Sequence, residues 1–248
     1  SLPLGSHTIT LTVSSSGGGS DDDEVLINIV DTTAPTITVN GANPMTVECH
    51  TSFIDPGATA NDGCAGSFAA TASGGVNVNV PGSYTITYSA MDPSANSATP
   101  KTRTVIVVDT SGPTITLNGQ TPTLWPPDHK YHTFNVTDFV SSASDSCDTG
   151  LSISDVVISQ VTSDEPENGG GDGNTLNDIV IGDGCKSVQL RAERKGGGNG
   201  RVYTITFSVR DSSGNVGTAT ARVLVPSSQG GNAPVDDGPH YTVTGSCP

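Results

Sequence analysis

The sequence predicts an all-β protein made of tandem antiparallel sandwiches, and three observations support this fold class. A strand–turn–strand pattern recurs at residues 5–31, 82–109 and 201–226. Within each copy, apolar residues alternate with Thr and Ser, which is the period of a strand with one buried and one solvated face. No long stretch shows the 3.6-residue period of a helix, because Gly or Pro interrupts most windows.

The alternation assigns the buried face of each hairpin, because successive side chains of a strand point to opposite sides of the sheet. The apolar positions repeat in one register in the three copies: His7, Ile9 and Leu11; Tyr84, Ile86 and Tyr88; Tyr203, Ile205 and Phe207.

Two near-identical linkers follow the first two hairpins, DTTAPTITVNG from Asp31 and DTSGPTITLNG from Asp109. Their prolines, Pro35 and Pro113, fix φ and bias the preceding residue to extended geometry, so we expect no flexible joint there. The predicted boundaries are 1–31 for the C-terminal hairpin of an Ig-like domain or for exchanged strands, 32–109 for a complete Ig-like domain, 110–226 for a larger one with an acidic Gly-rich insertion, and 227–248 for a C-terminal tail with one added strand at Tyr241–Thr244.

Charge and composition exclude several classes of protein. The chain has 10 Lys+Arg against 25 Asp+Glu, a net charge of −15, which repels nucleic-acid phosphates. No apolar run approaches the length of a membrane span. Five cysteines, few lysines and abundant Thr, Ser, Gly and Asp favour a secreted or cell-surface protein in an oxidising, calcium-containing medium.

Longer motifs carry a family resemblance. They are MTVECHTSFIDPGATANDGC at 45–64 with the GSYTITYSAMDPSANSAT hairpin after it, LWPPDHK at 124–130, VTSDEPENGGGDGNTLNDI at 161–179 and VQLRAERKGGGNGRVYTITFSVRDSSGN at 188–215. With these motifs the chain resembles bacterial secreted proteins with tandem Ig-like domains of the hyalin-repeat and related types. The resemblance implies the Ig-like fold and leaves function open, since such domains serve as stalks, spacers, adhesins and enzyme appendages.

The cysteine spacing predicts two disulfides. Cys49 and Cys64 lie 15 residues apart, and a bridge across that loop would contribute about 3 kcal/mol. Cys147 and Cys185 flank the insertion and form the second predicted pair. Cys247 is then the odd cysteine, which is free, pairs with Cys185 or Cys147 instead, or bonds another chain.

Calcium is the predicted cofactor, and the insertion is its first candidate site. Hard cations take six to eight oxygen ligands, and glycines let backbone carbonyls turn inward. The alternative is a solvated acidic loop. The candidate ligands surround a Gly-rich loop: Asp164, Glu165, Glu167, Asp172, Asn174 and Asp178.

The linker aspartates form a second kind of candidate calcium site. Asp31 or Asp109 would meet an acidic hairpin turn, such as 21–23 or Asp92, and an ion there would tie neighbouring sandwiches together. The alternative is an aspartate that caps its own turn.

No catalytic motif of the GxSxG, GxxxxGK[ST] or HExxH type is present, so we expect a non-catalytic protein. The predicted function is an extracellular structural or adhesive rod of calcium- and disulfide-stabilised Ig-like domains, with homotypic subunits or surface glycans or proteins as partners. Residues 1–31 cannot bury their apolar faces alone, which favours as one alternative a homopolymer, a filament or sheath joined by strand sharing or head-to-tail contacts. A second alternative is the polysaccharide-binding region of a secreted hydrolase.

Overall fold

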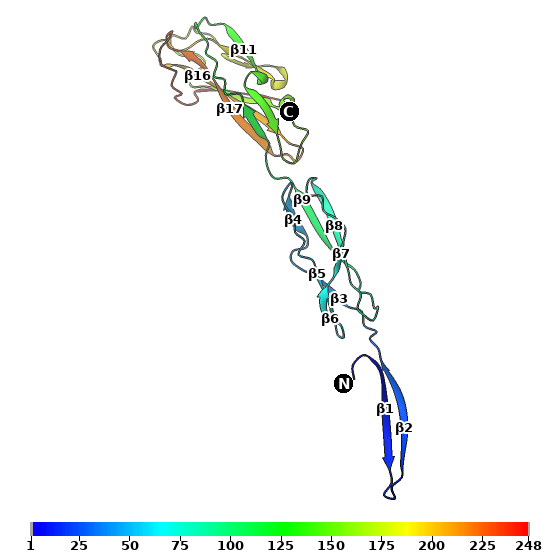
Figure 1. Ribbon diagram of the computed structural model, residues 1–248. Coiled ribbons are helices and arrows are strands. Elements are labelled where there is room, and N and C mark those ends of the chain that lie inside the picture. Colours follow the sequence, from blue (N-terminus) through cyan, green and yellow to red (C-terminus); the bar gives the residue numbers. More distant parts are fainter. Residues whose placement is uncertain (1, 248) are drawn as a thin grey trace. The chain divides into compact units, whose positions relative to one another are not determined.

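The computed structural model describes residues 2–247 and divides into two compact units, one ending at Val108 and one beginning at Asp109. Both units consist of β-strands, with three short 3-10 turns in the second (Figure 1). The predicted all-β fold class is confirmed.

The first unit contains a separate hairpin and a two-layered sandwich. One sheet has the order β3-β5-β6 and the other the order β4-β9-β8-β7, in which β4 runs parallel to β9. The strands are β1 (Gly5–Ser14), β2 (Ser20–Ile29), β3 (Thr36–Val39), β4 (Met45–Glu48), β5 (Ala58–Asp62), β6 (Gly66–Ala69), β7 (Thr71–Ser73), β8 (Gly82–Ser89) and β9 (Lys101–Val108).

The predicted register of the second hairpin is confirmed by its packing. Ile86 and Tyr88 of β8 are buried, and Val105 and Val107 of β9 lie beside them in the core. Alternation places Arg103 on the same buried face, and its side chain is fully buried. The core of this sandwich therefore contains a guanidinium group, which needs partners for its donors.

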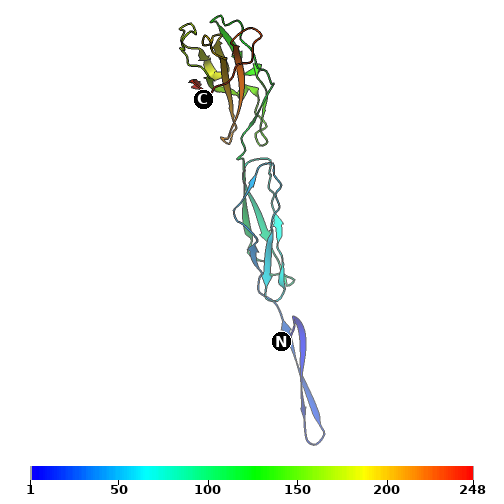
Figure 2. The same cartoon turned by 90° about the vertical axis from the view of Figure 1, so that its left-hand side faces the viewer.

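The hairpin β1–β2 is a two-stranded sheet, with Gly5 opposite Ile29 and Ser14 opposite Ser20 (Figure 2). Ile9 and Leu11 are 44% and 65% exposed, although their counterparts in β8 are buried. The hairpin thus has the sequence pattern of a sandwich hairpin, but its sheet contains only these two strands within residues 2–247.

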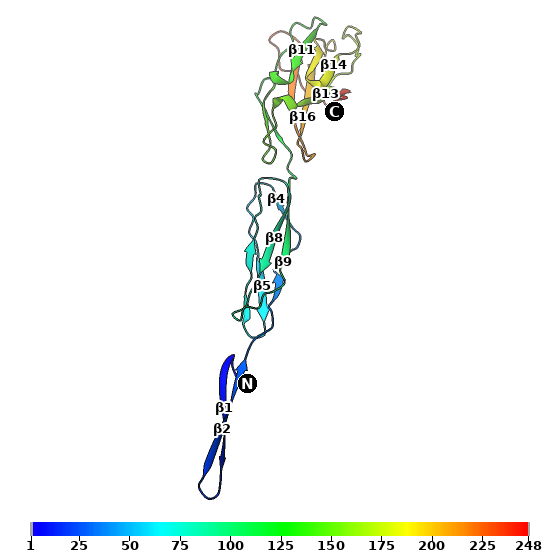
Figure 3. The same ribbon diagram turned by 90° about the vertical axis from the view of Figure 1, so that its right-hand side faces the viewer.

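The second unit contains a four-stranded sheet of order β17-β16-β13-β18, a three-stranded sheet β11-β15-β14 and the pair β10-β12 (Figure 3). Its elements are β10 (Thr114–Leu117), β11 (Tyr131–Asn135), η1 (Val136–Asp138), β12 (Val140–Ser144), η2 (Ile153–Asp155), β13 (Val157–Ser163), β14 (Ile179–Ile181), η3 (Asp183–Cys185), β15 (Ser187–Arg191), β16 (Gly200–Arg210), β17 (Val216–Pro226) and β18 (Tyr241–Thr244).

The core of the second unit also follows the predicted alternation. Tyr203, Ile205 and Phe207 of β16 are fully buried between the sheets. The added strand predicted at Tyr241–Thr244 is confirmed as β18, which pairs antiparallel with β13.

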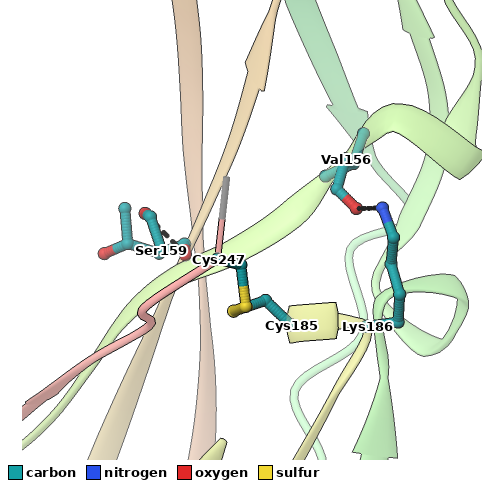
Figure 4. The surroundings of a disulfide bond; sticks show 6 residues. Val156, Ser159, Cys185, Lys186 and Cys247 are labelled. Atoms are coloured by element: carbon teal, nitrogen blue, oxygen red, sulfur yellow. Dashed lines mark hydrogen bonds between the residues drawn. A yellow bond between two sulfur atoms is a disulfide. The ribbon is translucent and has the colours of Figure 1, made fainter. Parts of the chain in front are cut away.

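The disulfide at the end of the chain corrects one predicted pairing. Cys185 is bonded to Cys247, with their Cα atoms 6.0 Å apart (Figure 4). The pairing of β18 with β13 continues to the bond from Gly245 N to Ser159 O, which directs Cys247 toward η3. The predicted Cys147–Cys185 bridge is therefore wrong, and of the alternatives for Cys247 the bond to Cys185 forms.

The predicted Cys49–Cys64 bridge is also wrong, because Cys64 is an exposed free thiol. It lies in the tight turn between β5 and β6, where the Asp62 carboxylate accepts hydrogen bonds from the backbone of Cys64 and Ala65. Cys49 is buried at the end of β4, which belongs to the other sheet. Cys49 and Cys147 are each disulfide-bonded.

Candidate functional site

The acidic insertion of the second unit is organised around a buried arginine. Arg201 of β16 is fully buried, and its Nη1 lies 2.5 Å from Asp178 Oδ2 while its Nε lies 3.1 Å from Glu165 Oε2. The same guanidinium also donates to Tyr203 Oη at 3.0 Å. Two of the six predicted calcium ligands are thus brought together by a cation that belongs to the chain.

The other predicted ligands of the insertion have separate partners. Asp164 Oδ1 accepts the backbone N–H of Val202 at 2.8 Å, and Glu167 accepts the Tyr241 hydroxyl at 2.9 Å. Asp172 closes its own turn by accepting the N–H of Asn174 at 3.1 Å. Within residues 2–247, no three acidic groups of this loop gather at one point.

Burial governs the titration of the acids in this network. It raises the pKa of Asp178 from 3.8 to about 6, against the opposing effect of Arg201 and with a further upward contribution from Glu193. Burial likewise raises the pKa of Asp164 to about 6, although a hydrogen bond from Val202 opposes it. These acids are held in surroundings that disfavour their charge.

The linker aspartates, Asp31 and Asp109, each belong to a cluster of acidic side chains from separate segments of the chain. In the second unit, Asp109, Asp145 and Asp211 each present a carboxylate oxygen within 4.8 Å of the others. Asp211 is 5% exposed and lies in the turn between β16 and β17, whereas Asp145 follows β12. Three segments distant in sequence therefore converge on one acidic centre.

The first unit has the corresponding cluster. Asp31, Asp62 and the thiol of Cys64 lie within 4.8 Å of one another, and the carboxylate of Asp92 interacts with that of Asp31. Burial opposes the ionisation of Asp92, but hydrogen bonds from Asn96 and Ser94 outweigh it and hold the pKa of this carboxyl below its usual value. The two clusters have the same construction: a linker Asp, an Asp two residues before a Cys, and a hairpin-turn Asp.

Hydrogen bonds repeat in the two clusters with the same geometry. The hairpin turn closes when Asp92 Oδ1 accepts the N–H of Asn96 at 2.8 Å, and Asp211 accepts that of Asn215 at the same distance. The Asn96 amide then reaches the Asp31 carbonyl at 3.1 Å. Each linker is thereby held against the turn of its own unit.

In each cluster, one buried carboxylate oxygen has no hydrogen-bond partner among the described residues. Asp62 uses Oδ1 to accept two backbone N–H groups, and Asp109 uses Oδ1 to accept that of Ser111. Asp62 Oδ2 and Asp109 Oδ2 are both buried and have no hydrogen-bond partner in the described structure. A buried carboxylate oxygen without a partner is costly, so it calls for a ligand.

Cys64 lies at the rim of the first cluster. Loss of some of its hydration in the turn, together with the negative charges of Asp31 and Asp62, raises the pKa of this exposed thiol. At neutral pH it is therefore a protonated thiol and a poor ligand for a soft metal.

Only some of the residues in these clusters could be predicted from the sequence. Asp31, Asp92 and Asp109 were candidates, and the structure brings Asp31 next to Asp92, whereas 21–23 lie in β2 at the far end of the hairpin. Asp62, Asp145 and Asp211 were missed. The available signals were the repeat of D-x-C in NDGC and SDSC and the repeat of D-x-x-x-N in DPSAN and DSSGN.

Arg103 and Arg201 were missed as centres of buried networks. Arg103 donates to Tyr88 Oη at 2.9 Å and lies 3.1 Å from Asp55 Oδ1. It also donates to the backbone carbonyls of Asn40 and Ala42. Strand alternation was the available signal, because each arginine occupies an inward position.

One family model matches part of the chain. Residues 37–107 match the family model described as the Ig-like domain of bacterial surface proteins. This segment covers the sandwich of the first unit, which is therefore similar to the Ig-like domains of bacterial surface proteins. No curated protein matches the chain, and the described residues contain no helix able to cross a membrane.

Several solved structures are similar at low identity. The EC3-6 region of protocadherin gammaB7 is 15% identical with a TM-score of 0.36, covering 90% of this chain and 60% of that one. A bacterial ice-binding adhesin is 13% identical with a TM-score of 0.28, covering 88% and 72%. The fibronectin(III)-like modules of Clostridium thermocellum CbhA are 11% identical with a TM-score of 0.23, covering 77% and 94%.

Proposed function

We propose that the chain is a non-catalytic structural and adhesive segment of a bacterial cell-surface protein. The observation that supports this function best is the match of residues 37–107 to the Ig-like domain of bacterial surface proteins. The buried acids of the second unit face arginines and backbone amides, as in a structural network. The disulfide between Cys185 and Cys247 suits an extracellular or cell-surface location.

We further propose the domain boundaries read from the repeats: a hairpin at 1–31, Ig-like domains at 32–109 and 110–226, and a tail at 227–248. Within this scheme the tail contributes β18 and Cys247 to the second Ig-like domain. The closer relationship to hyalin-repeat domains is part of the same proposal and rests on the motifs of the sequence.

Calcium is the proposed cofactor of this segment. In the insertion, Arg201 forms ion pairs with Glu165 and Asp178, and Arg191 lies 3.4 Å from Asp178, so positive charge from the chain already compensates these acids. Asp164 Oδ2 and Asp178 Oδ1 also lack hydrogen-bond partners among the described residues, but a calcium ion there has the weaker support because of the two arginines. The clusters at Asp31 and Asp109 also contain unpartnered carboxylate oxygens, but their aspartates form no salt bridge among residues 2–247, so they support the linker sites more strongly.

Homotypic assembly is a second candidate function, and the hairpin β1–β2 favours it. Ile9, Leu11 and Val25 are exposed on a two-stranded sheet, whereas sandwich hairpins bury such positions. Strands supplied by another copy would cover this face by β-augmentation. Surface glycans or proteins are the alternative partners.

Electron microscopy and surface labelling test these functions together. Antibody against residues 32–248 should label intact producing cells, and labelling that requires cell lysis would overturn the surface function. Regular fibres of the purified chain would favour homotypic assembly. Dispersed particles with the surface label intact would favour a spacer or adhesive segment instead.

A further inference from the structure

We propose that each unit binds one calcium ion between three aspartates: Asp31, Asp62 and Asp92 in the first unit, and Asp109, Asp145 and Asp211 in the second. This inference deepens the calcium part of the proposed function, because it assigns the ligands and a stoichiometry of two.

The charge of the clusters is the first argument. In the second unit three carboxylate oxygens come within 4.8 Å of one another, and Asp211 is 5% exposed. No salt bridge among residues 2–247 involves any of the six aspartates. Like charges at this separation repel, and a bound cation would compensate them.

The unpartnered oxygens are the second, independent argument. Asp62 Oδ2 and Asp109 Oδ2 are removed from solvent and have no donor within the described structure. In both residues Oδ1 is already engaged by the turn. The remaining oxygen is therefore free to coordinate an ion without disturbing the backbone.

The chemistry of the donors selects the kind of ion. The ligands common to the two clusters are carboxylates, which are hard oxygen donors suited to Ca²⁺. The thiol beside the first cluster belongs to Cys64, whereas the equivalent Cys147 is disulfide-bonded and offers no thiolate. A soft metal that required sulfur would therefore fit one cluster only.

The repetition within one chain is the third argument. In each unit a linker Asp lies close to the Asp of a D-x-C turn, and a hairpin-turn Asp lies beside the linker Asp. The same Asn-to-linker hydrogen bonds are present, at 3.1 Å in the first unit and 3.2 Å in the second. An ion at each cluster would join the linker, the D-x-C turn and the hairpin turn at one end of its sandwich. Removal of the ion would loosen all three segments together.

The test uses the full chain and calcium chloride after dialysis against chelator. Isothermal titration should show two calcium ions per chain for the wild type. Asp62→Asn and Asp145→Asn should each remove one ion, because asparagine keeps the Oδ1 that closes the turn and loses the charge. The double variant should bind neither ion at calcium concentrations that saturate the wild type, which requires an affinity at least about tenfold weaker at both sites. Cys64→Ser and Asp138→Asn should still bind two.

Melting temperatures measured with and without calcium distinguish an aspartate that binds the ion from one that only stabilises the fold. In chelator, Asp62→Asn and Asp145→Asn should melt at or above the wild-type temperature, since each removes one of three repelling charges. With calcium, the wild type should gain stability and the double variant should not. A wild type that binds no calcium would overturn the proposal, as would loss of binding in Asp172→Asn with full binding in the double variant. Surface labelling of producing cells is independent of either result and tests the broader function separately.

Discussion

Asn215 donates its side-chain amide to the backbone carbonyl of Asp109 at 3.2 Å and so fastens the β16–β17 turn to the linker that begins the second unit. The same amide donates to Asp211 Oδ2 at 2.9 Å. One asparagine thus closes its own turn and holds the linker at the same time. Asn96 does the same with Asp31 and Asp92 in the first unit.

Replacement of Asn215 by alanine should destabilise the second unit. It removes two side-chain hydrogen bonds and leaves the buried Asp211 with one donor fewer, a loss of about 1 to 3 kcal/mol. Urea denaturation followed by circular dichroism measures the change. The matched control is Asn168→Ala, because Asn168 is exposed, and we expect it to change stability by less than about 0.5 kcal/mol. Equal effects of the two variants would refute the role of Asn215.

Arg201→Met should be among the most destabilising single substitutions in the chain. It leaves the largely buried Glu165 without its cation and removes from the buried Asp178 the closer of its two arginines, which costs about 3 to 5 kcal/mol. The control is Arg222→Met, because Arg222 is 57% exposed in its ion pair with Asp236 and should contribute less than about 1 kcal/mol. If Arg201→Met unfolded at the same urea concentration as the wild type, the stabilising role of the buried network would be contradicted.

The raised pKa of Asp164 predicts a pH dependence with a definite sign. Folding raises this pKa from 3.8 to about 6, mainly through burial, so the folded state holds the proton more tightly than the unfolded state. The contribution of Asp164 to stability is therefore greatest below pH 4 and falls as the pH rises through 6.

Asp164→Asn tests this sign, because the amide keeps Oδ1 for the Val202 N–H and carries no charge. In chelator, the variant should be more stable than the wild type by about 1 to 2 kcal/mol at pH 7.5, and the difference should shrink toward pH 4. Asp138→Asn provides the control, with its exposed carboxyl. A variant less stable than the wild type at pH 7.5 would show that the charge of Asp164 is favourable.

The Cys185–Cys247 disulfide should stabilise the second unit chiefly by restricting the unfolded chain. It links residues separated by 62 positions, and a loop of that size corresponds to about 4 kcal/mol in the chain-entropy model. The double variant Cys185→Ala/Cys247→Ala should lower the melting temperature under non-reducing conditions. Cys64→Ser, which replaces a free exposed thiol, should not. An unchanged melting temperature in the double variant would contradict this role.

Much of the fold could be predicted because it depends on local periodicity. Alternation at Ile86 and Tyr88, and at Ile205 and Phe207, determines which face is buried, and the structure agrees. The disulfides could not be predicted from spacing, because the partner of Cys185 is set by the pairing of β18 with β13.

The aspartate clusters were predictable only in part, because they too depend on contacts between segments that are distant in sequence. Asp31 and Asp109 stand out in near-identical linkers, whereas Asp62 and Asp145 become neighbours of those linkers only when the sheets close. In the acidic insertion, by contrast, the sequence predicts an ion site where the structure has a network centred on a buried arginine. Its closely spaced acids are typical of an ion site, but Arg201 occupies an inward position on β16 and places its guanidinium among them.

Single-molecule force spectroscopy of the full chain under reducing conditions tests the structural function most directly. If the chain serves as a mechanical segment of two Ig-like units, each stiffened by calcium, pulling on its ends should give two separate unfolding events. Their contour lengths should correspond to residues 32–108 and 109–247, and both unfolding forces should fall when calcium is replaced by chelator. Forces that are the same in calcium and in chelator, or extension without two discrete events, would contradict the account.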